Sequence, residues 1–156
     1  MSEYTDVMQQ FPLDSKPDIA AFSHFLDIYY SKLNKQTLPT WADFRVTDFL
    51  GWHSNMALSN KAGDDYRFKI FGTGFVDLFG RDYTGALICE TMASGHVGFL
   101  KKHFQLLIEG PGIGWVKGKL PLEGRDYLPF EVIDLPLSNE AGEVVSFIHL
   151  LGLKLK

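Results

Sequence analysis

A strict alternation of apolar and polar residues marks the stretch 66–70. Its apolar side chains, which fall on one side, are Tyr66, Phe68 and Ile70. A two-residue period predicts a β-strand with one buried face. Gly72-Thr73-Gly74 ends this strand, and the apolar spacing of residues 75–79 predicts a short helix that Thr73 can cap. We expect the strand and the helix to form one wall of a small pocket.

A longer helix is predicted nearer the N-terminus, from Pro17-Asp18 to about Lys35. Its apolar residues repeat at three-then-four spacing and are Ile19, Phe22, Leu26, Tyr29 and Leu33. Such a stripe can dock onto the domain's own sheet or pair with the same helix of a second copy. Neighbouring apolar residues widen the stripe, which favours docking. Residues 1–17 are polar with scattered apolar side chains, and we expect them to be loosely ordered.

The rest of the chain predicts four more strands and one more long helix. A strand over 56–59 would pair antiparallel with the strand at 66–71 through a polar turn. Residues 96–109 have an apolar helical face, and Gly110-Pro111-Gly112 ends that helix. Three further strand-like segments follow, at 113–122, 127–137 and 144–155.

The last of these segments indicates how the layers are arranged. Its apolar residues occupy both faces and are Val144, Val145, Phe147, Ile148, Leu150 and Leu151. A strand with one wet face should alternate, so the N-terminal helix or a second subunit must cover the outer side. The predicted fold class is therefore α+β, with a five-stranded antiparallel sheet, helices crossing one face and the N-terminal helix covering the other.

Composition limits the partners and the compartment. A chain of 156 residues with 46% hydrophobic residues is long enough for one folded domain. Its net charge of −4 argues against nucleic acid, which needs a concentrated cationic surface. The lone Cys89, which we expect to be buried, fits a reducing cytoplasm. Residues 1–17 have the pattern of neither a signal peptide nor a membrane span, so we expect a cytoplasmic protein with no membrane partner.

Three stretches resemble PAS domains, in particular the small stand-alone bacterial PAS-like proteins. Leu38-Pro39-Thr40-Trp41-Ala42-Asp43 is similar to the entry segment of that family. Residues 66–73 followed by 79–85 are similar to its "FRYRxxGT…FGRDxTG" signature, and Pro136-Leu137 with the hydrophobic last strand is similar to its end. The resemblance covers the chain from about Tyr30 and implies a PAS-like domain at 38–156, preceded by the segment 1–17 and the helix 18–37.

The resemblance implies a sensory or regulatory function without enzymatic activity. Members of the family bind small molecules, dimerise and act through protein partners. We therefore expect a small apolar or aromatic ligand, a signalling protein as partner, or both. A homodimer through the N-terminal helix or the outer sheet face is a further expectation.

Six residues are candidates for a ligand pocket. They are Phe68, Ile70, Phe75, Phe79, Trp115 and His149. The simpler interpretation is that these side chains fill the core at ordinary packing density. His149 lies between Phe147 and Leu151 on one side of its strand, as a core histidine or as a polar anchor for a ligand.

The cofactor is unknown from the sequence, and the two commonest PAS cofactors are disfavoured. Cys89 lies in Ile88-Cys89-Glu90-Thr91, which lacks the Asn-Cys-Arg-Phe-Leu run of photosensing flavin domains. His103 lies on the helix where haem-binding relatives carry their iron ligand, but Lys101 and Lys102 beside it predict an exposed face. No set of His, Cys, Asp and Glu has metal-ligand spacing.

Two other functions remain open. A cone-shaped α+β enzyme of the isomerase or dehydratase kind would need an acid–base pair at an apolar cavity, which His149 could form with Asp134 or Glu131. The predicted strand order argues against that fold. The other possibility is a purely structural homodimer built on the N-terminal helix.

Overall fold

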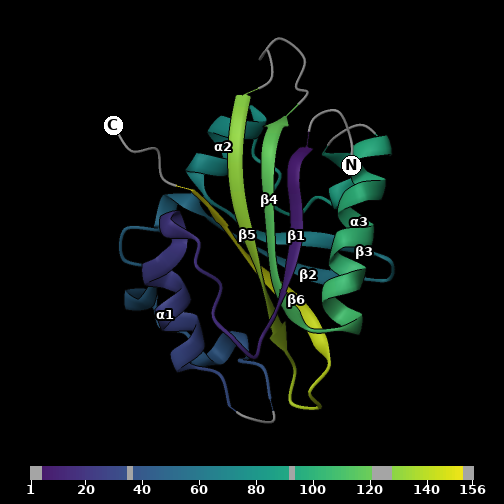
Figure 1. The fold of residues 1–156 in the computed structure, drawn as a ribbon. Helices are drawn as coiled ribbons and strands as arrows, with labels where there is room; N and C mark the ends of the chain where they lie inside the picture. The colour runs from purple at the N-terminus through teal and green to yellow at the C-terminus, as the bar shows by residue number, and fades with distance from the viewer. Residues whose placement is uncertain (1–4, 35–36, 92–93, 121–127, 153–156) are drawn as a thin grey trace.

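The computed structural model describes residues 5–34, 37–91, 94–120 and 128–152 and has one antiparallel sheet as its centre (Figure 1). Six strands lie in the order β1-β4-β5-β6-β2-β3. The strands are β1 Thr5–Pro12, β2 Met56–Ala62, β3 Asp65–Phe71, β4 Gly112–Leu120, β5 Leu128–Ser138 and β6 Val144–Leu151. The helices are α1 Ser23–Ser31, α2 Thr73–Phe79 and α3 Ser94–Glu109. Short 3-10 helices span Ala20–Phe22, Trp41–Asp43, Val46–Phe49, His53–Asn55 and Ile88–Glu90.

The sheet has a sixth strand besides the five predicted, because residues 5–12 form a strand within the segment that we expected to be loosely ordered. Residues 5–12 form β1, which pairs antiparallel with β4 at the edge of the sheet. The pairing continues from Val7 opposite Lys117 to Pro12 opposite Gly112. The prediction failed because this segment has no clean apolar alternation, and its order comes from the neighbouring strand rather than from its own pattern.

The N-terminal helix covers one face of the sheet, as predicted. Phe22, Phe25, Leu26 and Tyr29 are completely buried in a core cluster that includes Leu135 and Ile148. The Tyr29 hydroxyl donates a hydrogen bond of 2.7 Å to the Pro136 carbonyl. The apolar stripe is therefore used within the chain, which confirms docking onto the domain's own sheet.

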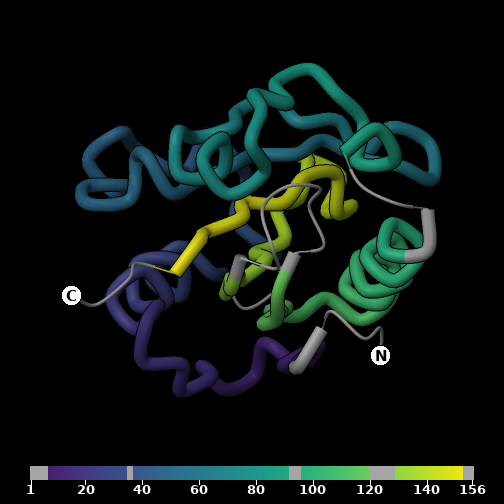
Figure 2. The backbone as a smooth tube through the Cα atoms, turned by 90° about the horizontal axis from the view of Figure 1, so that it is seen from above, coloured from purple at the N-terminus to yellow at the C-terminus, as the bar shows by residue number. Residues whose placement is uncertain are grey.

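The opposite face of the sheet is covered by α2 and α3. Figures 1 and 2 show α1 and α3 on opposite sides of the strands. A second core cluster fills the space under α2 and α3, and its largest members are Tyr66, Phe68, Phe71, Phe75, Phe104 and Phe147. Covered faces on both sides explain why β6 has apolar residues on both of its faces, with Ser146 and His149 as its polar residues.

A β-bulge in β3 changes which residues share a face. Leu58 of β2 pairs with Ile70 but the next residue, Ser59, pairs with Phe68, so Lys69 is an extra residue. A bulge shifts the alternation by one position. Phe68 therefore faces α3, whereas Ile70 packs with the cluster under α1. The expectation that Phe68 and Ile70 share one face was wrong.

None of the helices in the described ranges is long and apolar enough to span a bilayer.

Candidate ligand site between α3 and the sheet

A line of residues crosses the sheet on the face that carries α3. The strand registers place Gln10 opposite Gly114, Gly114 opposite Asp134, and Asp134 opposite His149. Residues directly opposite each other on antiparallel strands point to the same face. Four strands therefore bring three polar side chains and one glycine into a row beneath α3.

His103 of α3 fits into this row above Gly114. A Cβ on Gly114 would lie 2.5 Å from His103 Nε2 and 2.8 Å from the Leu107 side chain, closer than atoms can pack. The absent side chain thus leaves room for the imidazole between Gln10 and Asp134. This explains the glycine in the middle of a buried strand.

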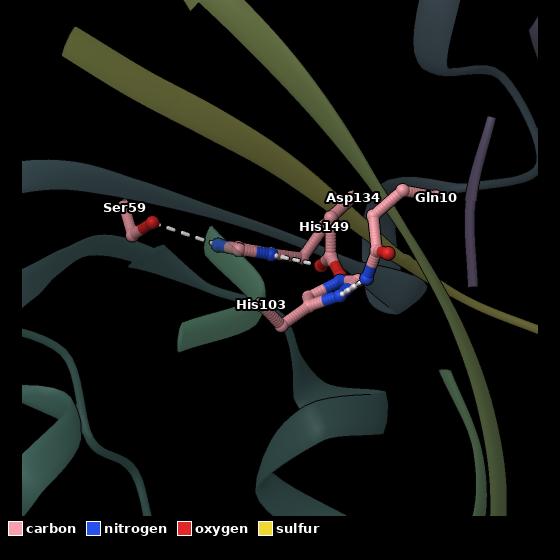
Figure 3. Close-up of polar contacts among 5 residues, drawn as sticks. All are labelled: Gln10, Ser59, His103, Asp134 and His149. Carbon is pink, nitrogen blue, oxygen red and sulfur yellow. Dashed lines mark hydrogen bonds and ion pairs between the residues drawn. The ribbon is translucent and has the colours of Figure 1, made fainter. Parts of the chain in front are cut away.

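Five side chains form one continuous hydrogen-bonded chain, shown in Figure 3. Gln10 Nε2 lies 2.8 Å from His103 Nδ1, and His103 Nε2 lies 3.0 Å from Asp134 Oδ2. On the other side, His149 Nδ1 lies 2.6 Å from Asp134 Oδ1, and His149 Nε2 lies 2.7 Å from Ser59 Oγ. Both imidazoles therefore donate an N–H to the central carboxylate, and the other nitrogen of each ring contacts the Gln10 amide or the Ser59 hydroxyl.

The central carboxylate is ionised although it is buried. Burial by itself would raise the pKa of Asp134, which is only 2% exposed, but the hydrogen bonds from His103 and His149 outweigh this and lower its pKa to about 2. A buried carboxylate requires such donors, because an unpaired charge in the interior is strongly destabilising. The network thus holds a negative charge between α3 and the sheet.

The two ends of the network can exchange donor and acceptor roles. Ser59 ends one side with a hydroxyl, which can donate or accept, and Gln10 ends the other with an amide, which has both kinds of atom.

Beside this network lies a cavity of about 70 Å³. Its walls come from α2, α3, the 3-10 helix at Ile88–Glu90 and four strands. The lining residues are Phe68, Phe75, Leu78, Phe79, Ile88, His96, Leu100, Phe104, Val116, Phe130, Val132, Asp134 and His149. Four of the six predicted pocket residues are brought together here, namely Phe68, Phe75, Phe79 and His149.

The other two predicted pocket residues lie elsewhere. Ile70 and Trp115 pack against the core cluster on the α1 side of the sheet. The indole N–H of Trp115 donates a hydrogen bond of 2.9 Å to Glu131 Oε2. Glu131 is thus engaged with Trp115, and Asp134 is the acid that pairs with His149.

His96 adds a polar atom with no partner among the described residues. The side chain lines the cavity from the first turn of α3 and is 5% exposed, and its Nδ1 atom is buried without a hydrogen bond. Burial lowers the pKa of His96 and thereby favours the neutral ring. A buried polar atom without a partner is destabilising unless water or a ligand contacts it.

An open groove adjoins the cavity. It measures about 510 Å³, and Leu78 and Phe130 line both spaces. The lining of the groove includes the polar residues Asn55, Lys117 and Glu131 among apolar ones. Leu78 and Phe130 therefore lie between the groove and the cavity.

The structure corrects two predictions about cofactor residues. His103 is fully buried rather than exposed, and both of its ring nitrogens are hydrogen-bonded, so neither is free to bind a haem iron. Cys89 is exposed rather than buried, because the 3-10 turn at Ile88–Glu90 directs Ile88 inward instead. A cavity of about 70 Å³ is also far below the roughly 300 Å³ at which sites for larger ligands begin, so a flavin or a haem does not fit it.

Ser59, His149 and Asp134 have the hydrogen-bond order of a Ser-His-Asp triad. Ser59 is completely buried, however, and is not among the residues that line the cavity. A nucleophile must reach a substrate atom, so this hydroxyl is not placed for catalysis. Its position fits an orienting role towards His149.

Among known proteins, only solved structures resemble this chain. No protein-family model and no curated protein sequence matches the chain. Among solved structures, an RNA-binding light-oxygen-voltage receptor superposes with a TM-score of 0.56 at 12% identity, over 93% of this chain and 38% of the receptor. The PAS domain of the fruit-fly ELK potassium channel superposes with a TM-score of 0.47 at 23% identity, over 72% of this chain and 95% of that domain.

The chain has a PAS-like fold. The receptor match covers nearly all of this chain, and the α+β architecture predicted from the sequence is confirmed, with six strands in place of five. The chain spans 38% of the length of that receptor. At this level of identity the likeness concerns the fold alone.

Proposed function

We propose that this protein is a sensory domain that binds a small molecule between α3 and the sheet and signals through a protein partner. The observation that carries the proposal is the cavity beside Asp134 and His149. It combines apolar walls with a few polar groups, which is the usual composition of small-molecule sites. The PAS-like fold supports a sensory role by analogy.

The size of the cavity limits the ligand. An engineered protein cavity of about 150 Å³ binds benzene, so a space of about 70 Å³ suits a compact molecule with fewer atoms unless side chains move. The aromatic rings of Phe68 and Phe104 favour a flat or compact apolar body. The net charge of −4 argues against an RNA or DNA partner.

Ligand-observed NMR with a panel of small apolar and aromatic fragments tests this function. Leu100 lines the cavity from α3, whereas Leu106 on the same helix is 44% exposed. We expect Leu100→Trp to abolish fragment binding because the indole fills the cavity. Leu106→Trp, the matched control, should bind as the wild type does.

Two results would overturn the proposal. One is a panel in which no fragment binds the wild-type protein. The other is binding that persists in Leu100→Trp, which would place the fragments on another surface. Circular dichroism and thermal unfolding of both variants establish that each is folded before binding is compared.

A further inference from the structure

The polar groups of the cavity specify the ligand more closely. We propose that the site selects a small, uncharged molecule that carries a hydrogen-bond donor, and that the Asp134 carboxylate accepts this donor while His96 forms a second polar contact. This inference rests on the proposed function and adds the chemical class of the ligand to it.

Asp134 has acceptor capacity that the protein does not use. An ionised carboxylate offers about four lone-pair positions. Among the described residues, Asp134 receives one hydrogen bond at each oxygen, from His103 and from His149. The residue also lines the cavity. A hydroxyl or N–H group inside the cavity would therefore find an acceptor that already carries a full charge, and such hydrogen bonds are the stronger kind.

His96 indicates a polar ligand independently of Asp134. Its buried Nδ1 atom lacks a partner in the described part of the chain, and its ring lines the same cavity. Asp134 comes from β5 and His96 from α3, so the cavity has polar groups on two separate elements. A ligand without any polar atom would leave His96 Nδ1 without a hydrogen bond and the additional lone pairs of Asp134 unused.

The remaining walls exclude a charged ligand. Apart from His96, Asp134 and His149, every lining residue is apolar. An anionic ligand would be repelled by the Asp134 carboxylate. A cationic ligand would lose its hydration in an apolar space whose carboxylate already has two imidazole donors. A neutral donor avoids both costs.

Three five-membered rings of similar size separate these possibilities. Pyrrole is neutral and has an N–H donor, furan is neutral and has none, and pyrrolidine is a cation near neutral pH. We would titrate each into uniformly ¹⁵N-labelled protein and follow amide and imidazole resonances. Because a hydrogen bond to a charged group contributes about one factor of ten or more in affinity, pyrrole should bind at least about tenfold more tightly than furan.

The imidazole signals report whether Asp134 is the acceptor. The His149 and His103 N–H groups share its two oxygens, so pyrrole but not furan should shift their proton resonances. Asp134→Asn should reduce the preference for pyrrole over furan to within about threefold, since the acceptor charge is lost.

Pyrazole is a neutral five-membered ring with an N–H donor and a second ring nitrogen that can contact His96, so it should bind His96→Leu more weakly than the wild type, while pyrrole, whose single N–H goes to Asp134, should bind both alike. His24→Leu, at an exposed position on α1, should bind pyrazole as the wild type does. Equal pyrazole binding by the wild type and His96→Leu would overturn the His96 contact.

The outcomes separate this inference from the proposed function. Equal affinities for pyrrole and furan would overturn the donor requirement and leave small-molecule binding intact. Tightest binding by pyrrolidine would overturn the neutral class in favour of a cation site. If neither neutral ring binds, the donor inference fails, and the fragment panel decides separately whether any small molecule binds in the cavity. Should Asp134→Asn not fold, the wild-type affinities and imidazole shifts decide the matter, together with His96→Leu.

Discussion

His103 on α3 occupies the space that a side chain on Gly114 of β4 would fill. A Cβ at Gly114 would lie 2.5 Å from His103 Nε2, the atom that is also 3.0 Å from Asp134 Oδ2. The position of the helix on the sheet and the geometry of the buried network therefore depend on one absent side chain. A substitution at Gly114 therefore changes both the packing of α3 on β4 and the hydrogen bonds of His103.

Gly114→Ala should destabilise the protein by about 1–3 kcal/mol, because the His103 ring would have to move away from the new methyl group and break its hydrogen bonds to Gln10 and Asp134. Chemical denaturation measures the change. Gly98→Ala is the matched control, since nothing lies within 4 Å of a Cβ there and the site is in α3. That variant should gain about 0.5–1 kcal/mol from helix propensity. Equal effects of the two substitutions would contradict the close approach of His103 to β4.

Acid should destabilise the protein through Asp134. Its pKa in the folded protein is about 2, below the ordinary 3.8, so the ionised form is favoured by folding. This contribution is complete above the ordinary pKa and is lost as the pH falls towards 2. It amounts to about 2 kcal/mol. Carbon-13 NMR of the carboxyl group measures the pKa directly, and an ordinary value would contradict the network.

Asp134→Asn should remove the buried charge and cost about 1–3 kcal/mol, because the amide keeps one acceptor oxygen and places an N–H₂ group opposite the other buried imidazole N–H. The variant should also lose the acid sensitivity that Asp134 contributes. Asp18→Asn is the matched control, because it makes the same chemical change at an exposed position outside the network. It should alter the free energy of unfolding by less than about 0.5 kcal/mol. Urea denaturation at several pH values compares the three proteins.

Gln10→Ala should loosen β1 from α3. The Gln10 amide contacts His103 from the edge strand, and loss of one such hydrogen bond costs about 1 kcal/mol. Hydrogen exchange should therefore accelerate in β1 more than in β5. Gln9 is exposed on the same strand, and Gln9→Ala should leave the exchange of β1 unchanged. Identical exchange in the two variants would argue that His103 does not hold the strand.

Tyr29→Phe should cost about 1–2 kcal/mol, because it leaves the buried Pro136 carbonyl without its donor. The neighbouring Tyr30 donates a longer, exposed hydrogen bond of 3.4 Å to the Ser15 carbonyl. Tyr30→Phe should thus have almost no effect on thermal unfolding. A comparable loss in both variants would contradict the docking of α1 through Tyr29.

The layers of the fold could be predicted because they depend on regular apolar patterns. Two patterns together required cover over each face: the stripe that includes Phe22, Leu26 and Tyr29, and the apolar residues on both faces of β6. β1 was missed because an edge strand needs little pattern of its own. The face of Ile70 was missed because one extra residue, Lys69, reverses the alternation.

The candidate site could be predicted only in part. The aromatic residues around Phe68 were found from strand and helix spacing, but the partner of His149 was left open between Asp134 and Glu131. The buried position of His103 had a signal in the sequence, since it follows Leu100 and precedes Leu107 at helical spacing. The neighbouring Lys101 and Lys102 instead indicated an exposed helix face, and the burial of His103 was not predicted. Contacts such as Gln10 with His103 join residues far apart in the chain, and no local pattern predicts them.

A crystal structure of the protein under xenon pressure tests the central claim most directly, because xenon enters small apolar cavities whatever their hydrogen-bonding groups. We predict one xenon atom between α3 and the sheet, in contact with Phe68, Phe104 and Val116. A space closed by these side chains, with xenon only elsewhere or nowhere, would contradict a ligand cavity beside Asp134 and His149.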